Sequence, residues 1–132
     1  MTFVDRATRC VLGWAVDWHV SDENLQDVLD DTLPSHWYYS DLLAAYQELA
    51  YDFGIHFPMK NKSQTYCVEA DNAQLRHYLA RLGRRSRCFS RSIHALRRAV
   101  RLFVFAWNQR QLRKQSFPHY PAHLFHFVSP CL

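Results

Sequence analysis

The chain has 132 residues, of which 48% are hydrophobic and 15% aromatic, with 16 lysines and arginines against 12 aspartates and glutamates. This composition excludes a disordered polyelectrolyte, and the length suits one domain, residues 1–132. All 12 carboxylates lie in residues 1–71 with only four cations, so this part carries −8, while residues 72–132 hold 12 cations and carry +12. The asymmetry predicts an anionic partner for the C-terminal part, either nucleic acid or an acidic membrane surface.

Nothing in the sequence indicates a membrane span, a secretion signal or a strong zinc site. The longest apolar run, Ala99–Trp107, is shorter than the roughly 20 residues that span a bilayer, and it contains Arg101. The first residues do not resemble a signal peptide, and the four cysteines form no C-x-x-C pair. We therefore expect a cytoplasmic protein with free thiols, and a zinc site among the tail histidines is a minor alternative.

The first elements in chain order are two short strands and a helix. The apolar runs Thr2–Val4 and Cys10–Val16 are rich in β-branched and aromatic residues and flank a polar turn, which is typical of paired strands. Ser21 precedes three polar residues and a helical apolar pattern, so it is a candidate N-cap. Pro34 is expected to follow the end of this helix.

A strand, a helix and an irregular segment are predicted next. His36–Ser40 is an aromatic run that predicts a strand ending at Asp41. Apolar residues recur at helical spacing in Leu42–Tyr51. The polar composition between Gly54 and Tyr66 predicts an irregular segment.

The basic C-terminal part is predicted to be helical and to end in a tail. One helix begins at Glu69 and is closed by Gly83, and a second is capped by Ser90 or Ser92. The tail Phe117–Leu132 contains three prolines and is expected to be extended over the body of the protein. The second helix has a wide apolar stripe, formed by Ile93, Leu96, Val100, Phe103, Val104 and Trp107.

Two carboxylates are candidates for metal chemistry. Asp41 follows the aromatic strand, Glu69 opens a helix, and Asn72 lies one helical turn further on. If strand end and helix start converge, they offer the hard oxygen ligands that Mg²⁺ prefers, and two such ions could promote reaction at a phosphodiester. Taken alone, the pattern favours a simpler interpretation, in which Asp41 caps the next helix and Glu69 complements the helix dipole.

Arginines dominate the region that follows, with no carboxylate between them. Arginine grips phosphate through two parallel hydrogen bonds, so the pattern favours sequence-tolerant contact with a nucleic-acid backbone. A solvated helix face is the second interpretation, although such faces usually mix signs, and membrane-surface binding is the third. The arginines of this region are Arg76, Arg81, Arg84, Arg85, Arg87 and Arg91.

The run Thr65–Ser92 closely resembles the C-terminal signature of the insertion sequence one family of bacterial transposases. That signature reads T-x-x-[IV]-E-x-x-N-x-x-L-R-x-x-L-A-R-L-x-R-[RK]-[ST]-x-x-F-S-[RK]-S, and segments near Asp5 and Asp41 also look like earlier parts of the family. The resemblance implies a ribonuclease-H-like core that uses three carboxylates, a DDE triad, and two Mg²⁺ ions to cut and join transposon-end DNA. Asp41 matches the second carboxylate and Glu69 the third, and Asn72 and the arginines match positions where DNA contact is expected.

Two departures from the family pattern are evident. Leu42 stands where family members usually have glycine after the second aspartate. The strand that carries the family's first aspartate precedes the segment that Thr2–Arg9 resembles, so this chain starts too late to contain it. The family sheet has the strand order 3-2-1-4-5, with that missing strand at its centre. We therefore expect an α/β fold, a ribonuclease-H-like core lacking its first strand, with two unpaired edges and a gap between them.

Three functional hypotheses follow from the sequence. In the first, the chain is part of a bacterial DDE transposase, associated with the nucleoid and inactive as this fragment because one carboxylate is absent. In the second, it is a non-catalytic DNA-binding fragment that associates with another copy or with intact transposase. In the third, it has no stable fold. The expected cofactor is Mg²⁺, and the expected partners are the transposon ends and target DNA, with no membrane.

Overall fold

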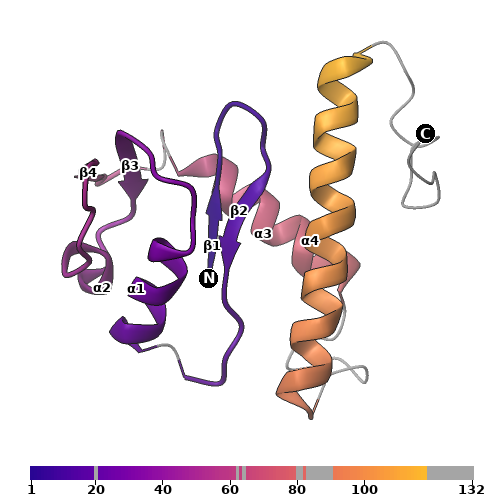
Figure 1. Cartoon of the computed structure of the whole chain (residues 1–132), viewed down its shortest axis with the longest axis horizontal. Coiled ribbons are helices and arrows are strands. Elements are labelled where there is room, and N and C mark those ends of the chain that lie inside the picture. The colour runs from indigo at the N-terminus through magenta and orange to yellow at the C-terminus, as the bar shows by residue number, and fades with distance from the viewer. Residues whose placement is uncertain (20, 62, 64, 80–81, 83–90, 119–132) are drawn as a thin grey trace.

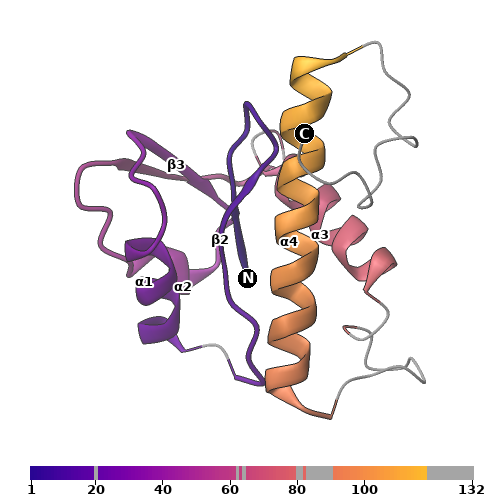
Figure 2. The same ribbon diagram turned by 45° about the vertical axis from the view of Figure 1, so that its right-hand side comes forward.

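The fold is a mixed α/β arrangement, described by a computed structural model for residues 1–19, 21–61, 63, 65–79, 82 and 91–118. Helices α1 and α2 lie on one side of a β-hairpin, and the long helix α4 lies on the other (Figures 1 and 2). In chain order the elements are β1 (Thr2–Val4), β2 (Val11–Trp14), α1 (Asp22–Asp30), β3 (Trp37–Ser40), α2 (Ala44–Gln47), β4 (Ile55–Pro58), α3 (Tyr66–Tyr78) and α4 (Ile93–Ser116).

The strands form two separate pairs. β1 and β2 are antiparallel, with Thr2 opposite Trp14, and a β-bulge shifts the register after Phe3. β3 and β4 are parallel, with Trp37 opposite Ile55. The described strands therefore make two two-stranded sheets, and β1 and β3 each have one neighbour only.

The turn between β1 and β2 is shaped by its own polar side chains. The Asp5 carboxylate accepts hydrogen bonds from the Thr8 hydroxyl at 2.5 Å, from the Thr8 amide at 3.0 Å and from the Ala7 amide at 3.3 Å. Arg9 closes the turn with a φ of 61°, a left-handed conformation that is uncommon outside glycine and asparagine. Its guanidinium is fixed by Asp71 of α3 at 2.6 Å, so a long-range ion pair stabilises the strained residue.

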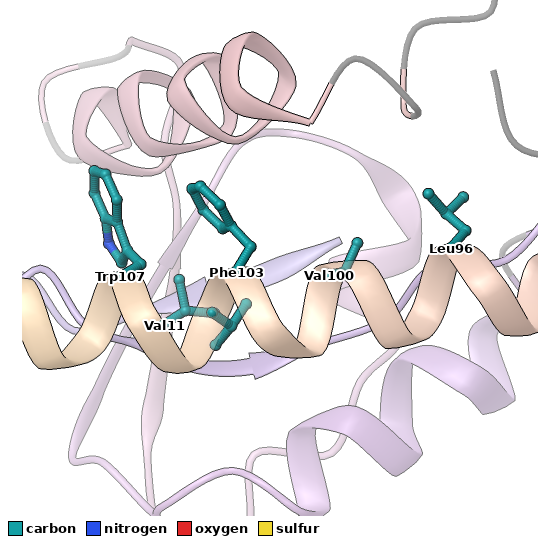
Figure 3. Packing of buried hydrophobic residues seen from close by; sticks show 6 residues of the cluster. Val11, Leu96, Val100, Phe103 and Trp107 are labelled. Carbon is teal, nitrogen blue, oxygen red and sulfur yellow. The ribbon is translucent and has the colours of Figure 1, made fainter. Parts of the chain in front are cut away.

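Helix α4 contributes most of the main hydrophobic core. Its apolar stripe packs on Val11 of β2, as Figure 3 shows, and Val100 is the most deeply buried residue at 1% exposure. A second, smaller core lies under α1, where Leu25, Leu29 and Leu49 are buried against Phe3 and other partly buried side chains. The stripe residues buried in the main core are Leu96, Val100, Phe103, Val104 and Trp107.

Helix caps confirm two of the sequence predictions. The Ser21 hydroxyl accepts a hydrogen bond from the Asn24 amide at the start of α1, and the Ser92 hydroxyl accepts one from the Ala95 amide at the start of α4. α3 begins at Tyr66, earlier than predicted, and its C-cap is Leu79, while the predicted closing residue, Gly83, lies outside the described residues. The alternative cap Ser90 lies outside the described residues.

Two predictions in the middle of the chain were wrong. The helix expected over Leu42–Tyr51 is reduced to the single turn α2, which has no side-chain cap and leaves Leu42 and Leu43 exposed. The segment predicted to be irregular contains strand β4, in which Phe57 stacks on Tyr39 with ring centroids 5.5 Å apart. This strand is stabilised by its pairing with β3. The polar residues around it in the sequence gave no indication of a strand.

Among the described residues, no helix is both long and apolar enough to cross a membrane. Cys10 and Cys67 are buried, free thiols. The tail prediction for Phe117–Leu132 falls mainly on residues 119–132, which lie outside the described part of the chain.

Candidate functional site

Asp41 is the first residue after β3, and its side chain shapes the turn into α2. One carboxylate oxygen, Oδ1, accepts a hydrogen bond from the Leu43 amide at 3.1 Å, and the residue is exposed. The preceding Ser40 hydroxyl donates to the Asp41 carbonyl oxygen at 2.8 Å and lies 2.7 Å from His56 Nε2. Burial lowers the pKa of His56, which favours the neutral imidazole. Asp41 thus shapes the turn before α2 but is not the helix cap expected from sequence, because the N-cap is Leu43 and α2 has no side-chain cap bond.

Glu69 and Asn72 lie on α3, on the side of the helix near β1. Glu69 is exposed in the first turn, where its charge complements the helix dipole. One turn later, the Asn72 side-chain oxygen accepts a hydrogen bond from the Thr2 hydroxyl at 2.8 Å. This bond ties α3 to β1 across 70 positions of sequence and fixes the side of α3 that carries Glu69.

A cavity of about 360 Å³ brings these residues together. Asp41 and Glu69 both line it, together with Thr2, Ser40 and Asn72. The cavity lies between β1 and β3, which stand apart in the ribbon (Figure 1). Two carboxylates 28 positions apart in sequence therefore line one partly open cavity.

Most other carboxylates with defined contacts serve the fold. Asp5 also lines the cavity, but its carboxylate is held by the turn, and the Thr8 hydroxyl lowers the pKa of Asp5. Asp71 is buried against Arg9, and Asp17 pairs with Arg97 of α4 at 2.7 Å. Among the carboxylates that line the cavity, Asp41 and Glu69 are the two that the sequence analysis singled out.

The donor set fits part of a magnesium site. Two carboxylates and a side-chain amide oxygen are hard ligands of the kind that Mg²⁺ takes, and Mg²⁺ commonly retains several waters. No group of three or more histidines, cysteines, aspartates or glutamates in the described part of the chain is arranged to hold a metal ion. Asp41 and Glu69 therefore offer an incomplete carboxylate set.

The predicted basic region is described only at its ends. Arg76 on α3 is exposed, and together with burial it lowers the pKa of the Met1 ammonium, so Arg76 lies near the start of β1. Arg91 is exposed just before α4. The remaining predicted contacts, Arg81, Arg84, Arg85 and Arg87, lie outside the described residues.

A second cavity, of about 400 Å³, lies between α3 and α4 and was missed from sequence. Arg9, Arg110 and Lys114 line it, and its one carboxylate, Asp71, is already paired with Arg9. Arg110 Nε is buried and has no hydrogen-bond partner within the described residues, and burial together with Arg110 and Arg9 lowers the pKa of Lys114. This excess of positive charge favours the binding of an anion in the cavity. No pattern in the sequence predicts that these residues meet, because Arg9 lies in the turn between β1 and β2 whereas Arg110 and Lys114 lie on α4.

No protein-family model, no curated protein and no solved structure matches the chain.

Proposed function

We propose that this chain is part of a DDE transposase resembling the insertion sequence one family, which cuts and joins transposon-end DNA with two Mg²⁺ ions. The observation that carries the proposal is the shared cavity of Asp41 and Glu69. These are the residues that the signature matches to the second and third carboxylates. Their convergence supports the match, because the resemblance assigned them from separate segments of the chain.

The strand arrangement supports a ribonuclease-H-like core that lacks its central strand. Removal of strand 1 from the order 3-2-1-4-5 leaves two pairs, 3-2 and 4-5. The chain has two such pairs, β2–β1 and β3–β4, with a cavity between β1 and β3. β1 and β3 do not pair with each other, so the two strand pairs remain separate sheets.

Each cavity residue has a definable task in the proposed site. Asp41 is oriented by the Leu43 amide, and the Thr2 hydroxyl fixes Asn72 and with it the side of α3 that carries Glu69. Mg²⁺, when bound by Asp41 and Glu69, would neutralise phosphate charge and activate the attacking hydroxyl. Arg76, which is exposed and close enough to lower the pKa of the Met1 ammonium, would attract the DNA backbone.

Residues 1–132 by themselves are proposed to be inactive, because chemistry requires all metal ligands in one geometry and none of these residues matches the first aspartate of the triad. The test is Mg²⁺-dependent nicking of transposon-end DNA by the chain extended with the coding sequence upstream of Met1. Asp41→Ala and Glu69→Ala should each abolish nicking. Asp27→Ala, which removes an exposed carboxylate of α1, is the matched control and should retain it. Equal nicking by all three variants would refute the assignment.

The second candidate function is DNA binding without catalysis, and the cationic cavity between α3 and α4 favours it. Phosphate could be held by Arg110 and Lys114, whose charges have no carboxylate of their own in that cavity. The affinity for duplex DNA should fall steeply as the salt concentration rises. Arg110→Gln should make the plot of log affinity against log salt concentration less steep by about the amount that one phosphate contact contributes. Arg97→Gln is the matched control, since Arg97 is engaged by Asp17. A flat salt response would exclude this function.

A further inference from the structure

The core-facing side of α4 changes character after Trp107. Up to that residue the side is apolar and packs on β2. Arg110, Gln111 and Lys114 continue the same side, because they follow Trp107 at helical spacings of three, four and seven residues. The Trp107 side chain is directed from α4 toward α3 (Figure 3). The side of α4 that forms the core therefore ends in three polar residues at the cavity of about 400 Å³ between the two helices, named here the α3–α4 cavity.

Two of these polar residues carry buried groups that have no hydrogen bond. Gln111 is only 7% exposed, and its side-chain amide forms no hydrogen bond with any other described residue. Arg110 Nε is also buried and has no partner in the described part of the chain. The great majority of buried polar groups are paired, because an unpaired one costs free energy. Gln111 and Arg110 therefore offer donors that a bound ligand would satisfy.

The α3–α4 cavity is also positively charged. Among the described residues, three cations line it against one carboxylate, so the lining carries a net charge of +2. That carboxylate, Asp71, already accepts hydrogen bonds of 2.6 and 3.2 Å from the guanidinium of Arg9. Burial, together with Arg110 and Arg9, lowers the pKa of Lys114, so the three cations lie close together. The Arg110 guanidinium lies 6.0 Å from the Trp107 ring centre, a contact that helps to hold it at the cavity.

We propose that the α3–α4 cavity binds a phosphate monoester, the group found at a DNA 5′ end or on a mononucleotide. A monoester carries nearly two negative charges at neutral pH and three free oxygens, which match the net charge of the cavity and the donors of Arg110, Gln111 and Lys114. A phosphodiester within a DNA strand carries one charge and is flanked by sugars on both sides, so it is less suited to a cavity whose donors are buried. The volume also leaves room for the group that carries the phosphate.

Monoester binding deepens the second candidate function, DNA binding, on which only the DNA-end source of the ligand rests. It is independent of Asp41 and Glu69, because no residue lines both their cavity and the α3–α4 cavity. A flat salt response of duplex DNA affinity with retained monoester binding would refute the DNA-binding function alone. Salt-dependent DNA binding without monoester binding would refute the monoester site alone.

The first test is isothermal titration calorimetry of the unmodified chain with methyl phosphate, a monoester, and dimethyl phosphate, a diester, at equal ionic strength. The two probes differ by one methyl group and one negative charge. We expect methyl phosphate to bind about tenfold or more tightly, because it offers the cavity a second charge and a third free oxygen. Equal affinities, or no binding of either probe, would overturn the proposal.

Gln111→Leu separates a role in binding from a role in stability. The substitution roughly keeps the side-chain volume but removes a buried amide that has no partner in the described part of the chain. We expect the affinity for methyl phosphate to fall about tenfold, because a hydrogen bond to a charged group is lost, while the midpoint of urea unfolding stays the same or rises. Unchanged affinity in a folded Gln111→Leu chain would overturn the proposal.

A matched pair of charge variants on α4 tests where the monoester binds. Lys114→Gln removes a charge that lines the cavity, and Arg98→Gln removes an exposed charge of the same helix outside it. Lys114 is itself exposed, so neither change disturbs the core. Lys114→Gln should weaken methyl phosphate binding about tenfold and Arg98→Gln by less than about twofold. Equal losses would mean that the net charge of the chain attracts the probe, and would overturn the proposal.

Two further ligands distinguish the sources of the monoester. A gain of about tenfold in affinity when a single-stranded oligonucleotide carries a 5′ phosphate in place of a 5′ hydroxyl would identify a DNA end. Binding of adenosine monophosphate at least as tightly as methyl phosphate, without that gain, would identify a free nucleotide. Either result supports the site when Lys114→Gln weakens it. If Lys114→Gln changes neither affinity, the proposal is overturned.

Discussion

The Asn108 side chain of α4 seals the outer edge of β2, because its oxygen accepts a hydrogen bond from the Val11 amide and its NH₂ group donates to the Val11 carbonyl. Replacement of Asn108 by leucine tests how much this contact contributes to stability. Asn108→Leu removes two hydrogen bonds of 2.8 Å and leaves both backbone groups of Val11 without their partner. Val11 is only 6% exposed, so water cannot readily replace the amide. Each unpaired buried group costs about 1–3 kcal/mol, and the added apolar surface of leucine offsets part of this. We expect the free energy of unfolding to fall by about 2–4 kcal/mol.

The assay is urea unfolding followed by circular dichroism at 222 nm. A fall in the midpoint at an unchanged m-value would indicate lost stability rather than a change in the surface exposed on unfolding. Gln109→Leu is the matched control, because Gln109 is the exposed neighbour of Asn108 on the same helix and should change stability by less than about 0.5 kcal/mol. If the two variants lose equally little stability, Asn108 does not seal the edge of β2.

Three further predictions concern ionisable groups. Asp71→Ala should lower the free energy of unfolding in urea by about 2–4 kcal/mol, because it leaves the partly buried guanidinium of Arg9 without its carboxylate. Asp17→Ala, which breaks an exposed pair, should lower it by less than about 1 kcal/mol, and equal losses would contradict the prediction. The Thr8 hydroxyl lowers the pKa of Asp5 in the folded state, so the stabilisation from the ionised Asp5 is present above its unfolded pKa of about 4 and is lost as the pH falls further. The difference in unfolding free energy between wild type and Thr8→Val should therefore narrow in acid. A difference that stays constant with pH would show that this hydrogen bond is absent. Burial raises the pKa of Tyr51 to about 12, so the free energy of unfolding should fall between about pH 10 and 12. The tyrosinate absorbance should show a late step in this range that Tyr51→Phe removes. A titration complete near pH 10 would refute the prediction.

Local signals in the sequence were sufficient for several elements. Ser21 was predicted as one cap and Ser90 or Ser92 as the other, because a hydroxyl before a helix bonds an amide three residues on, which is a short-range geometry. The apolar stripe of α4 was also correct, since the helical repeat itself places its residues on one side. β4 was missed because its stability comes from pairing with β3, about 18 residues earlier.

The candidate site divides in the same way. The sequence determined that Asp41 would follow an aromatic strand and that Glu69 would lie in the first turn of a helix, because both positions depend on neighbours along the chain. Only the tertiary structure decided that the two carboxylates share a cavity, that Asn108 seals one sheet edge, and that Arg110 and Lys114 gather beside Arg9. These contacts join residues separated by tens of positions. They depend on how helices pack on strands, which local propensity does not encode.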